Sequence, residues 1–124
     1  MKCEITFDNG SPDGCFLSIG ELEISDNSFS LTYETDGDKC FLSYSDGKVF
    51  NRRRGSVALD MRFSEGEETS CSLGDDGLCG TFPVYTKKIL LAKTGGGINL
   101  KLIYNISGED FTLEITAAII QEKR

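Results

Sequence analysis

The sequence predicts an all-β protein: a single antiparallel β-barrel of about eight to ten strands, arranged as a meander over residues 1–124. Apolar and polar residues alternate with a period of two in many short runs, as they do in half-buried strands. Turn-forming pairs with glycine separate these runs, and the chain holds 14 glycines but only two prolines. With 39% hydrophobic and 10% aromatic residues, the 124 residues can fill one compact core.

The first half of the chain contains five predicted strands. In chain order they are residues 2–7, 15–24, 29–33, 39–45 and 48–54. The third is the clearest, because Phe29, Leu31 and Tyr33 share one face while Ser30 and Thr32 occupy the other. The pairs Asp36-Gly37 and Asp46-Gly47 lie between alternating runs and favour tight hairpin turns there.

The second half contains five more. They are Val57–Phe63, residues 68–73, residues 81–92, Ile98–Tyr104 and Phe111–Ala117. Ser107-Gly108 and the stretch Thr94–Gly97 supply turns. So many sequential antiparallel strands leave two open edges unless the sheet closes, which favours a barrel, with a sandwich as the alternative.

Two local features interrupt this plan. Pro83 cannot donate to a β-ladder and should mark an edge or a bulge. Residues Ile119–Lys123 allow a helical turn or two at the C-terminal end. We find no repeat, linker or second domain.

Absent residue types exclude several chemistries. The chain has no histidine and no tryptophan. The lack of histidine removes Ser/His/Asp and Cys/His catalytic arrangements, His-containing zinc sites and the usual proton shuttle near neutral pH. We therefore predict no catalytic residue, no metal site and no cofactor, and an enzyme is the least favoured class.

The ends and the cysteines indicate the compartment. Residues 1–10 lack the apolar core of a secretory signal. The longest nearly apolar stretch, Ala117–Ile120, is far shorter than the roughly 20 residues that span a bilayer. We therefore expect a cytoplasmic protein with no membrane partner.

The chain has an odd number of cysteines and no C-x-x-C pair, so we expect thiols. Cys3, Cys15 and Cys40 adjoin strand-like apolar residues and should be buried. Cys71 and Cys79 flank an acidic loop and could bind a soft metal together, but two thiolates make an incomplete site.

Charge is unevenly distributed. The net charge is −7, and two bases face ten acids in residues 1–47. One basic patch stands out, Lys48 with Arg52, Arg53 and Arg54. Clustered bases neutralise phosphates, but alternation in a strand sends Arg53 to one face and its two neighbours to the other. We therefore expect a solvated strand end and no nucleic-acid partner.

Arg53 is the strongest candidate for a ligand-binding residue. Alternation in a strand over residues 48–54 allows it to point into the barrel. A guanidinium in the barrel mouth can bind a carboxylate or phosphate through two parallel hydrogen bonds. The alternatives are an internal ion pair, with Glu34 or Glu114 as the partner, or exposure at the strand end.

Two loop features resemble ligand sites but have a simpler explanation. Asp36 and Asp38 suggest a calcium site, yet their spacing does not follow a calcium-binding loop, so we interpret them as turn-forming residues. Gly95–Gly97 can form an anion nest, but phosphate loops lead into a helix and this loop leads into a strand. We expect an ordinary hairpin loop there.

Several short motifs follow one another from about Gly20 to Ala117. They are Gly20-x-Leu22, Phe29-x-Leu31-x-Tyr33-Glu34, Val49-x-Asn51-Arg52-Arg53-Arg54-Gly55, Met61-Arg62-Phe63-x-x-Gly66, Gly80-Thr81-Phe82, Thr86-Lys87-Lys88 and Gly97-Ile98-x-Leu100-x-Leu102-x-Tyr104. Their order and spacing resemble the YwiB-like family, small uncharacterised bacterial proteins with a calycin-like, lipocalin-like β-barrel. The chain departs from that pattern at Asp75–Cys79, where the family usually has an aromatic residue and a Thr-Pro pair. The resemblance implies the barrel fold and brings no activity with it.

Three classes of function remain. A barrel of about eight strands can enclose a small ligand in its mouth, which favours an unknown small, anionic molecule contacted by Arg53, Tyr33 and Tyr104. The alternative is a protein-interaction or homodimerisation module without catalytic activity, which would use an exposed strand edge or an apolar patch. The third class, an enzyme, is ranked last.

Overall fold

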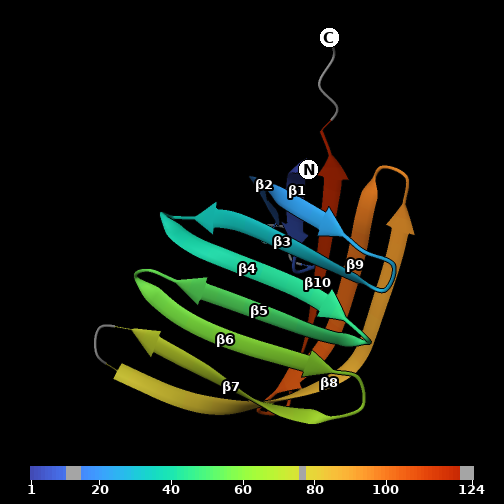
Figure 1. The fold of residues 1–124 in the computed structure, drawn as a ribbon. Coiled ribbons are helices and arrows are strands. Elements are labelled where there is room, and N and C mark those ends of the chain that lie inside the picture. The colour runs from blue at the N-terminus through green and yellow to red at the C-terminus, as the bar shows by residue number, and fades with distance from the viewer. Residues whose placement is uncertain (11–14, 76–77, 121–124) are drawn as a thin grey trace.

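The computed structural model describes residues 1–10, 15–75 and 78–120. Ten antiparallel strands follow one another and close into a barrel, because β1 pairs with both β2 and β10 (Figure 1). The strands are β1 (Lys2–Asp8), β2 (Cys15–Ile24), β3 (Ser28–Thr35), β4 (Asp38–Ser45), β5 (Lys48–Arg54), β6 (Val57–Ser64), β7 (Glu68–Asp75), β8 (Leu78–Thr94), β9 (Gly97–Ile106) and β10 (Glu109–Ile119). The predicted all-β barrel is thus confirmed, and each predicted range corresponds to one strand.

No helix long and apolar enough to cross a membrane occurs among the described residues. The predicted helical turn over Ile119–Lys123 lies mostly outside them, and Ile119 itself ends β10.

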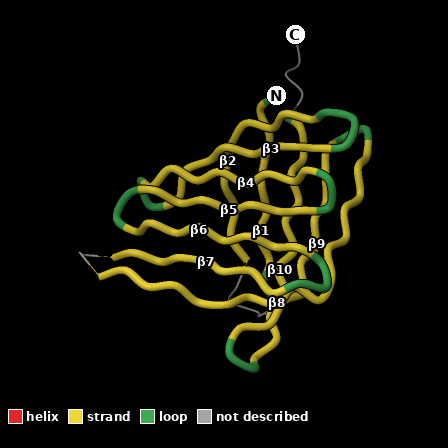
Figure 2. The backbone as a smooth tube through the Cα atoms, turned by 60° about the horizontal axis from the view of Figure 1, so that its bottom comes forward, coloured by secondary structure: helices red, strands yellow, loops and turns green. Residues whose placement is uncertain are grey.

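Tight turns join the strands, as the tube in Figure 2 shows. In Asp36-Gly37, Asp46-Gly47 and Ser107-Gly108 both residues have φ between 51° and 87°. Positive φ at both central residues is the signature of the type I′ turn, whose twist matches that of the flanking strands. The predicted hairpin turns at these three pairs are therefore confirmed.

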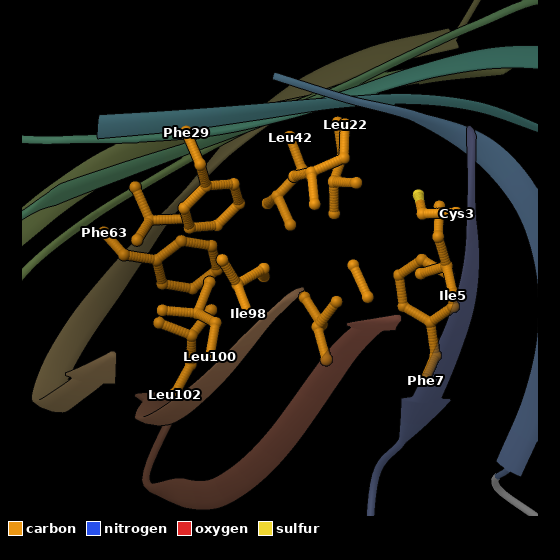
Figure 3. Close-up of a cluster of buried hydrophobic side chains, with 14 of the residues drawn as sticks. Cys3, Ile5, Phe7, Leu22, Phe29, Leu42, Phe63, Ile98, Leu100 and Leu102 are labelled. Atoms are coloured by element: carbon orange, nitrogen blue, oxygen red, sulfur yellow. The ribbon is translucent and has the colours of Figure 1, made fainter. Parts of the chain in front are cut away.

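The barrel interior is filled by apolar side chains from all ten strands (Figure 3). The buried cluster comprises Cys3, Ile5, Phe7, Leu22, Phe29, Leu31, Leu42, Val49, Phe63, Cys71, Val84, Ile98, Leu100, Leu102, Ile115 and Ala117. They come from alternate positions along each strand, as a pleated strand with one buried face requires. Figure 3 shows Phe29, Leu42 and Phe63 on one wall facing Ile98, Leu100 and Leu102 on the other.

Strand β8 changes partner along its length. Its first part pairs with β7 up to Tyr85, and its second part pairs with β9 from Tyr85 onward, with an irregularity between Thr86 and Lys88. Pro83 lies opposite Ser70 in the first part, where β9 is not yet a partner. A missing N–H donor costs little at such a one-sided position, so the predicted edge placement is confirmed.

The described cysteines are free thiols, as predicted. Cys3, Cys40 and Cys71 are buried and Cys79 is exposed, while the side chain of Cys15 lies outside the description.

Candidate functional site

Arg53 points inward and already has a partner there. Its Nε donates a hydrogen bond of 2.8 Å to Oδ2 of Asp38, a residue that is only 3% exposed. The ion-pair interpretation of Arg53 is therefore right, but the two partners named from the sequence are wrong. Glu34 alternates onto the outside of β3, and Glu114 accepts a hydrogen bond from Asn99 instead. The interpretation of Asp38 as a turn residue is also wrong, because it begins β4 with its carboxylate inside.

The Asp38 carboxylate also fixes the turn between β5 and β6. It accepts hydrogen bonds from the backbone N–H groups of Ser56 (2.8 Å) and Val57 (3.3 Å) and from the Ser56 hydroxyl (3.0 Å to Oδ2). A Cβ on Gly55 would lie 2.0 Å from Asp38 Oδ1, so this turn has no space for a side chain at that position. The Ser56 backbone bond and the Arg53 guanidinium lower the pKa of Asp38 to about 2. The whole group is a satisfied structural network.

The structure brings two of the three predicted ligand residues together. Tyr33 and Arg53 both lie opposite Cys40, one on each side of β4. The Tyr33 ring packs 5.1 Å from that of Phe7, and burial raises the pKa of its phenol. Tyr104 instead packs between the rings of two other aromatic residues, on β6 and β10.

A different set of side chains converges on the outside of the barrel. We call the outward-facing residues of β4, β5 and β6 the basic face. It comprises Lys39, Phe41, Ser43, Ser45, Lys48, Phe50, Arg52, Arg54, Ala58, Asp60, Arg62 and Ser64. Strand register places Lys39 opposite Arg54, and Phe50 opposite Arg62. Five basic residues thus share one surface with a single acidic residue.

Ion pairing leaves most of this charge uncompensated. Asp60 is shared by two arginines, with Arg54 Nη2 at 3.0 Å and Arg52 Nε at 3.5 Å. Together they lower the pKa of the Asp60 carboxyl, mainly through the Arg54 hydrogen bond. Within the described part of the chain, no carboxylate reaches ion-pair distance of the other three bases, Lys39, Lys48 and Arg62.

Two aromatic rings lie among these bases. The guanidinium carbons of Arg52 and Arg62 lie 5.2 Å and 5.5 Å from the centre of the Phe50 ring, which is within the range of cation–π contact. Phe41 is the cross-strand neighbour of Arg52. Both rings are half-buried, so each retains an accessible part.

Two open depressions mark the basic face. One, of about 570 Å³, includes Lys39, Phe41, Arg52 and Arg54 in its lining and extends to β1, β2 and β3, where Glu21 and Glu34 also line it. The other, of about 420 Å³, is lined by Lys48, Phe50, Arg62, serines 43, 45 and 64, and four further residues, among them Glu67. Strands β4 and β5 contribute to both.

Sequence reasoning found only part of this surface. The arginine run was visible, and the prediction that alternation divides it between two faces agrees with the burial pattern of β5. Lys39 and Arg62 come from neighbouring strands, so their convergence depends on the register of β4, β5 and β6. The alternation in these strands was a usable signal for their outward direction.

Comparisons with known proteins agree with the resemblance noted in the sequence. The family model described as "Domain of unknown function (DUF1934)" matches residues 3–116. Among solved structures, the crystal structure of ywiB protein from Bacillus subtilis is similar with a TM-score of 0.78. The two chains are 20% identical, and the alignment covers 97% of this chain and 91% of that one. At this identity the likeness shows the fold alone. No curated protein matches the chain.

Proposed function

Since the chain belongs to the DUF1934 family of domains of unknown function, we propose a function from its own residues: it is a non-catalytic binding protein that takes an anionic ligand on the basic face. This proposal keeps the anionic ligand expected from the sequence but moves it from the barrel mouth to the outer surface. Arg53, the residue on which the mouth hypothesis depended, is committed to Asp38.

The observation that carries the proposal is the local reversal of charge. Five bases and one acid give the basic face a charge of +4, so the remainder of a chain with a net charge of −7 carries −11. Like charges gathered on one surface repel each other, and an arriving anion relieves that repulsion. The acidic remainder repels the same anion and thereby directs it to this face.

The donor groups on the face suit phosphate or carboxylate oxygens. A guanidinium offers paired N–H donors to such a group, and a lysine ammonium adds a mobile point charge. The Ser43, Ser45 and Ser64 hydroxyls in the second depression can donate further hydrogen bonds.

Calorimetric titration with inorganic tripolyphosphate at low salt tests this proposal. Arg62→Met removes one uncompensated charge from the face and should weaken binding about threefold to tenfold. Lys88→Met removes an exposed charge from β8 instead and serves as the matched control, because it should leave the affinity unchanged. Equal losses in the two variants, or no binding by the unsubstituted protein, would refute an anion site on the basic face.

A homodimer is the second candidate, favoured by two neighbouring apolar side chains on the outside of β2. Leu17 is 60% exposed and Ile19 is 48% exposed. Apolar side chains exposed next to one another are a common feature of contact surfaces. Light scattering should then show a dimer for the unsubstituted protein and a monomer for the double variant Leu17→Ser, Ile19→Ser; a monomer in both cases removes this candidate.

A further inference from the structure

We infer that the anion bound by the basic face is a single strand of nucleic acid, an inference that rests on the proposed function. It departs from the expectation drawn from the arginine run alone. That run is indeed divided between two faces, but Lys39 and Arg62 from the neighbouring strands restore the charge on the outer one.

The aromatic rings are the reason to prefer nucleic acid over a simpler anion. A ligand that carries only charge gains no stacking contact from Phe41 and Phe50, whereas a nucleobase stacks on an aromatic ring or on a guanidinium plane. The guanidinium groups of Arg52 and Arg62 lie over the Phe50 ring, and a guanidinium plane is itself a surface on which a base can stack. Stacking of this kind is tolerant of sequence, because every base has a π-face.

The spacing of the two rings allows more than one base to stack. Phe41 lies opposite Arg52, and Phe50 lies opposite Ser43, so the two rings occupy diagonal positions on adjacent strands. Diagonal neighbours in an antiparallel pair lie roughly 7–8 Å apart. Two successive bases of an extended strand can therefore each reach a ring.

The basic side chains flank the two aromatic rings along a track that follows β5. Lys39 and Arg54 face each other at one end of this strand, and Lys48 lies at the other. Seven residues of β-strand extend roughly 20 Å. Phosphates along that length would meet positive charge at both ends and at Arg52 and Arg62 between them.

The geometry favours a single strand over a duplex. The described part of the chain contains no helix that could enter a major groove. The rings lie on a sheet surface, and the bases of a duplex are stacked on one another and cannot reach them. Splayed bases on a sheet with aromatic and basic residues are a recurrent mode of single-strand recognition. An acidic protein segment would satisfy the charges but not the rings, and the experiment below separates it.

Fluorescence anisotropy with a labelled 20-nucleotide oligothymidylate tests the inference. The logarithm of the apparent association constant should fall linearly with the logarithm of the salt concentration, with a slope of about −0.7 for each phosphate neutralised. Engagement of all five basic residues therefore gives a slope of roughly −3.5. Phe50→Leu should weaken binding about fivefold to a hundredfold and leave that slope unchanged, because it removes a stacking surface and no charge. Arg62→Met should lower the steepness of the slope by about 0.7. Tyr85→Leu replaces an exposed ring on β8 and should change neither quantity.

Each competing result has a distinct meaning. If tripolyphosphate or poly-glutamate displaces the oligonucleotide as effectively as unlabelled oligothymidylate does, and Phe50→Leu has no effect, the inference is wrong while the anion site of the proposed function stands. Equal or tighter binding of a 20-base-pair duplex also overturns the inference. If neither tripolyphosphate nor the oligonucleotide binds, the proposed function and the inference fail together. Circular dichroism of Phe50→Leu checks its fold, and the salt slope of the unsubstituted protein tests the inference independently of any variant.

Discussion

Replacing Arg53 and Arg62 in turn by methionine should separate structure from binding. Arg53→Met keeps an unbranched side chain as far as the position of Nε, but puts a methyl group where Nε now donates 2.8 Å to Asp38. A hydrogen bond between charged groups contributes roughly 1.5–3 kcal/mol. The Arg53 side chain is 27% exposed, so water can replace part of the interaction, and we expect a loss of about 1.5–2 kcal/mol.

That loss can be measured as a melting temperature. For a chain of this length, about 3–5 °C accompanies each kcal/mol, so the Arg53→Met variant should melt roughly 5–10 °C lower. Its affinity for tripolyphosphate should not change. Arg53→Gln provides a graded variant, because its amide nitrogen occupies the position of Nε and can still donate to Asp38. Its melting temperature should therefore lie between those of the unsubstituted protein and the Arg53→Met variant.

Arg62→Met makes the same chemical change on the outer surface. Arg62 is exposed and has no ion pair among the described residues, so its removal costs mainly the cation–π contact with Phe50, about 0.5–1 kcal/mol. Its effect should appear in tripolyphosphate affinity. Thermal unfolding followed by circular dichroism, together with calorimetric titration of the same samples, measures both quantities. If Arg53→Met keeps the melting temperature and loses the affinity, Arg53 binds the ligand and our reasoning is refuted.

Three further predictions concern acid stability, the contact between β9 and β10 at Gly97, and the charge of the basic face. The pKa of Asp38 is about 2 in the folded state against an ordinary 3.8, so its stabilising effect is complete above that ordinary value and is lost as the pH falls toward about 2. Acid titration followed by circular dichroism should show this loss, and Arg53→Met should move the transition to higher pH; an unchanged transition would contradict the assignment. Gly97→Ala should cost about 2–4 kcal/mol in urea unfolding, because its Cβ would lie 1.9 Å from a backbone oxygen of β10 at a φ of +148°. Gly95→Ala, in the turn just before β9 and with no atom within 4 Å of its added Cβ, should be nearly neutral, and equal effects of the two would count against a close approach of β9 and β10 at Gly97. Asp60→Asn removes the only acid of the basic face and should raise tripolyphosphate affinity about twofold to fivefold, whereas a lower affinity would show that the carboxylate contributes to the site.

The strands and turns were predictable because their causes are local. Alternation identifies a strand from its own residues, and pairs such as Asp46-Gly47 specify a turn through the positive φ that they tolerate. The inward direction of Arg53 followed from the same rule. Its partner did not, because the position of Asp38 depends on how β4 begins and on the conformation of the turn that contains Gly55.

The basic face was harder to foresee because it is a property of the sheet. Lys39 and Arg62 lie 14 and 9 residues from the centre of the arginine run at residues 52–54, and no local pattern joins them to it. Only the pairing of β4 with β5, and of β5 with β6, brings them onto one surface. The register also places Phe50 beside two guanidinium groups. We therefore interpret this region as a binding surface and no longer as a solvated strand end.

The most direct measurement of the central claim is an amide ¹⁵N–¹H titration of the isotopically labelled protein with tripolyphosphate. If the basic face is the anion site, the largest shifts will belong to residues of β4, β5 and β6, centred on Phe50, Arg52 and Arg62. If they belong instead to the inward residues around Tyr33 and Arg53, or if no amide responds, the anion site is not on the basic face.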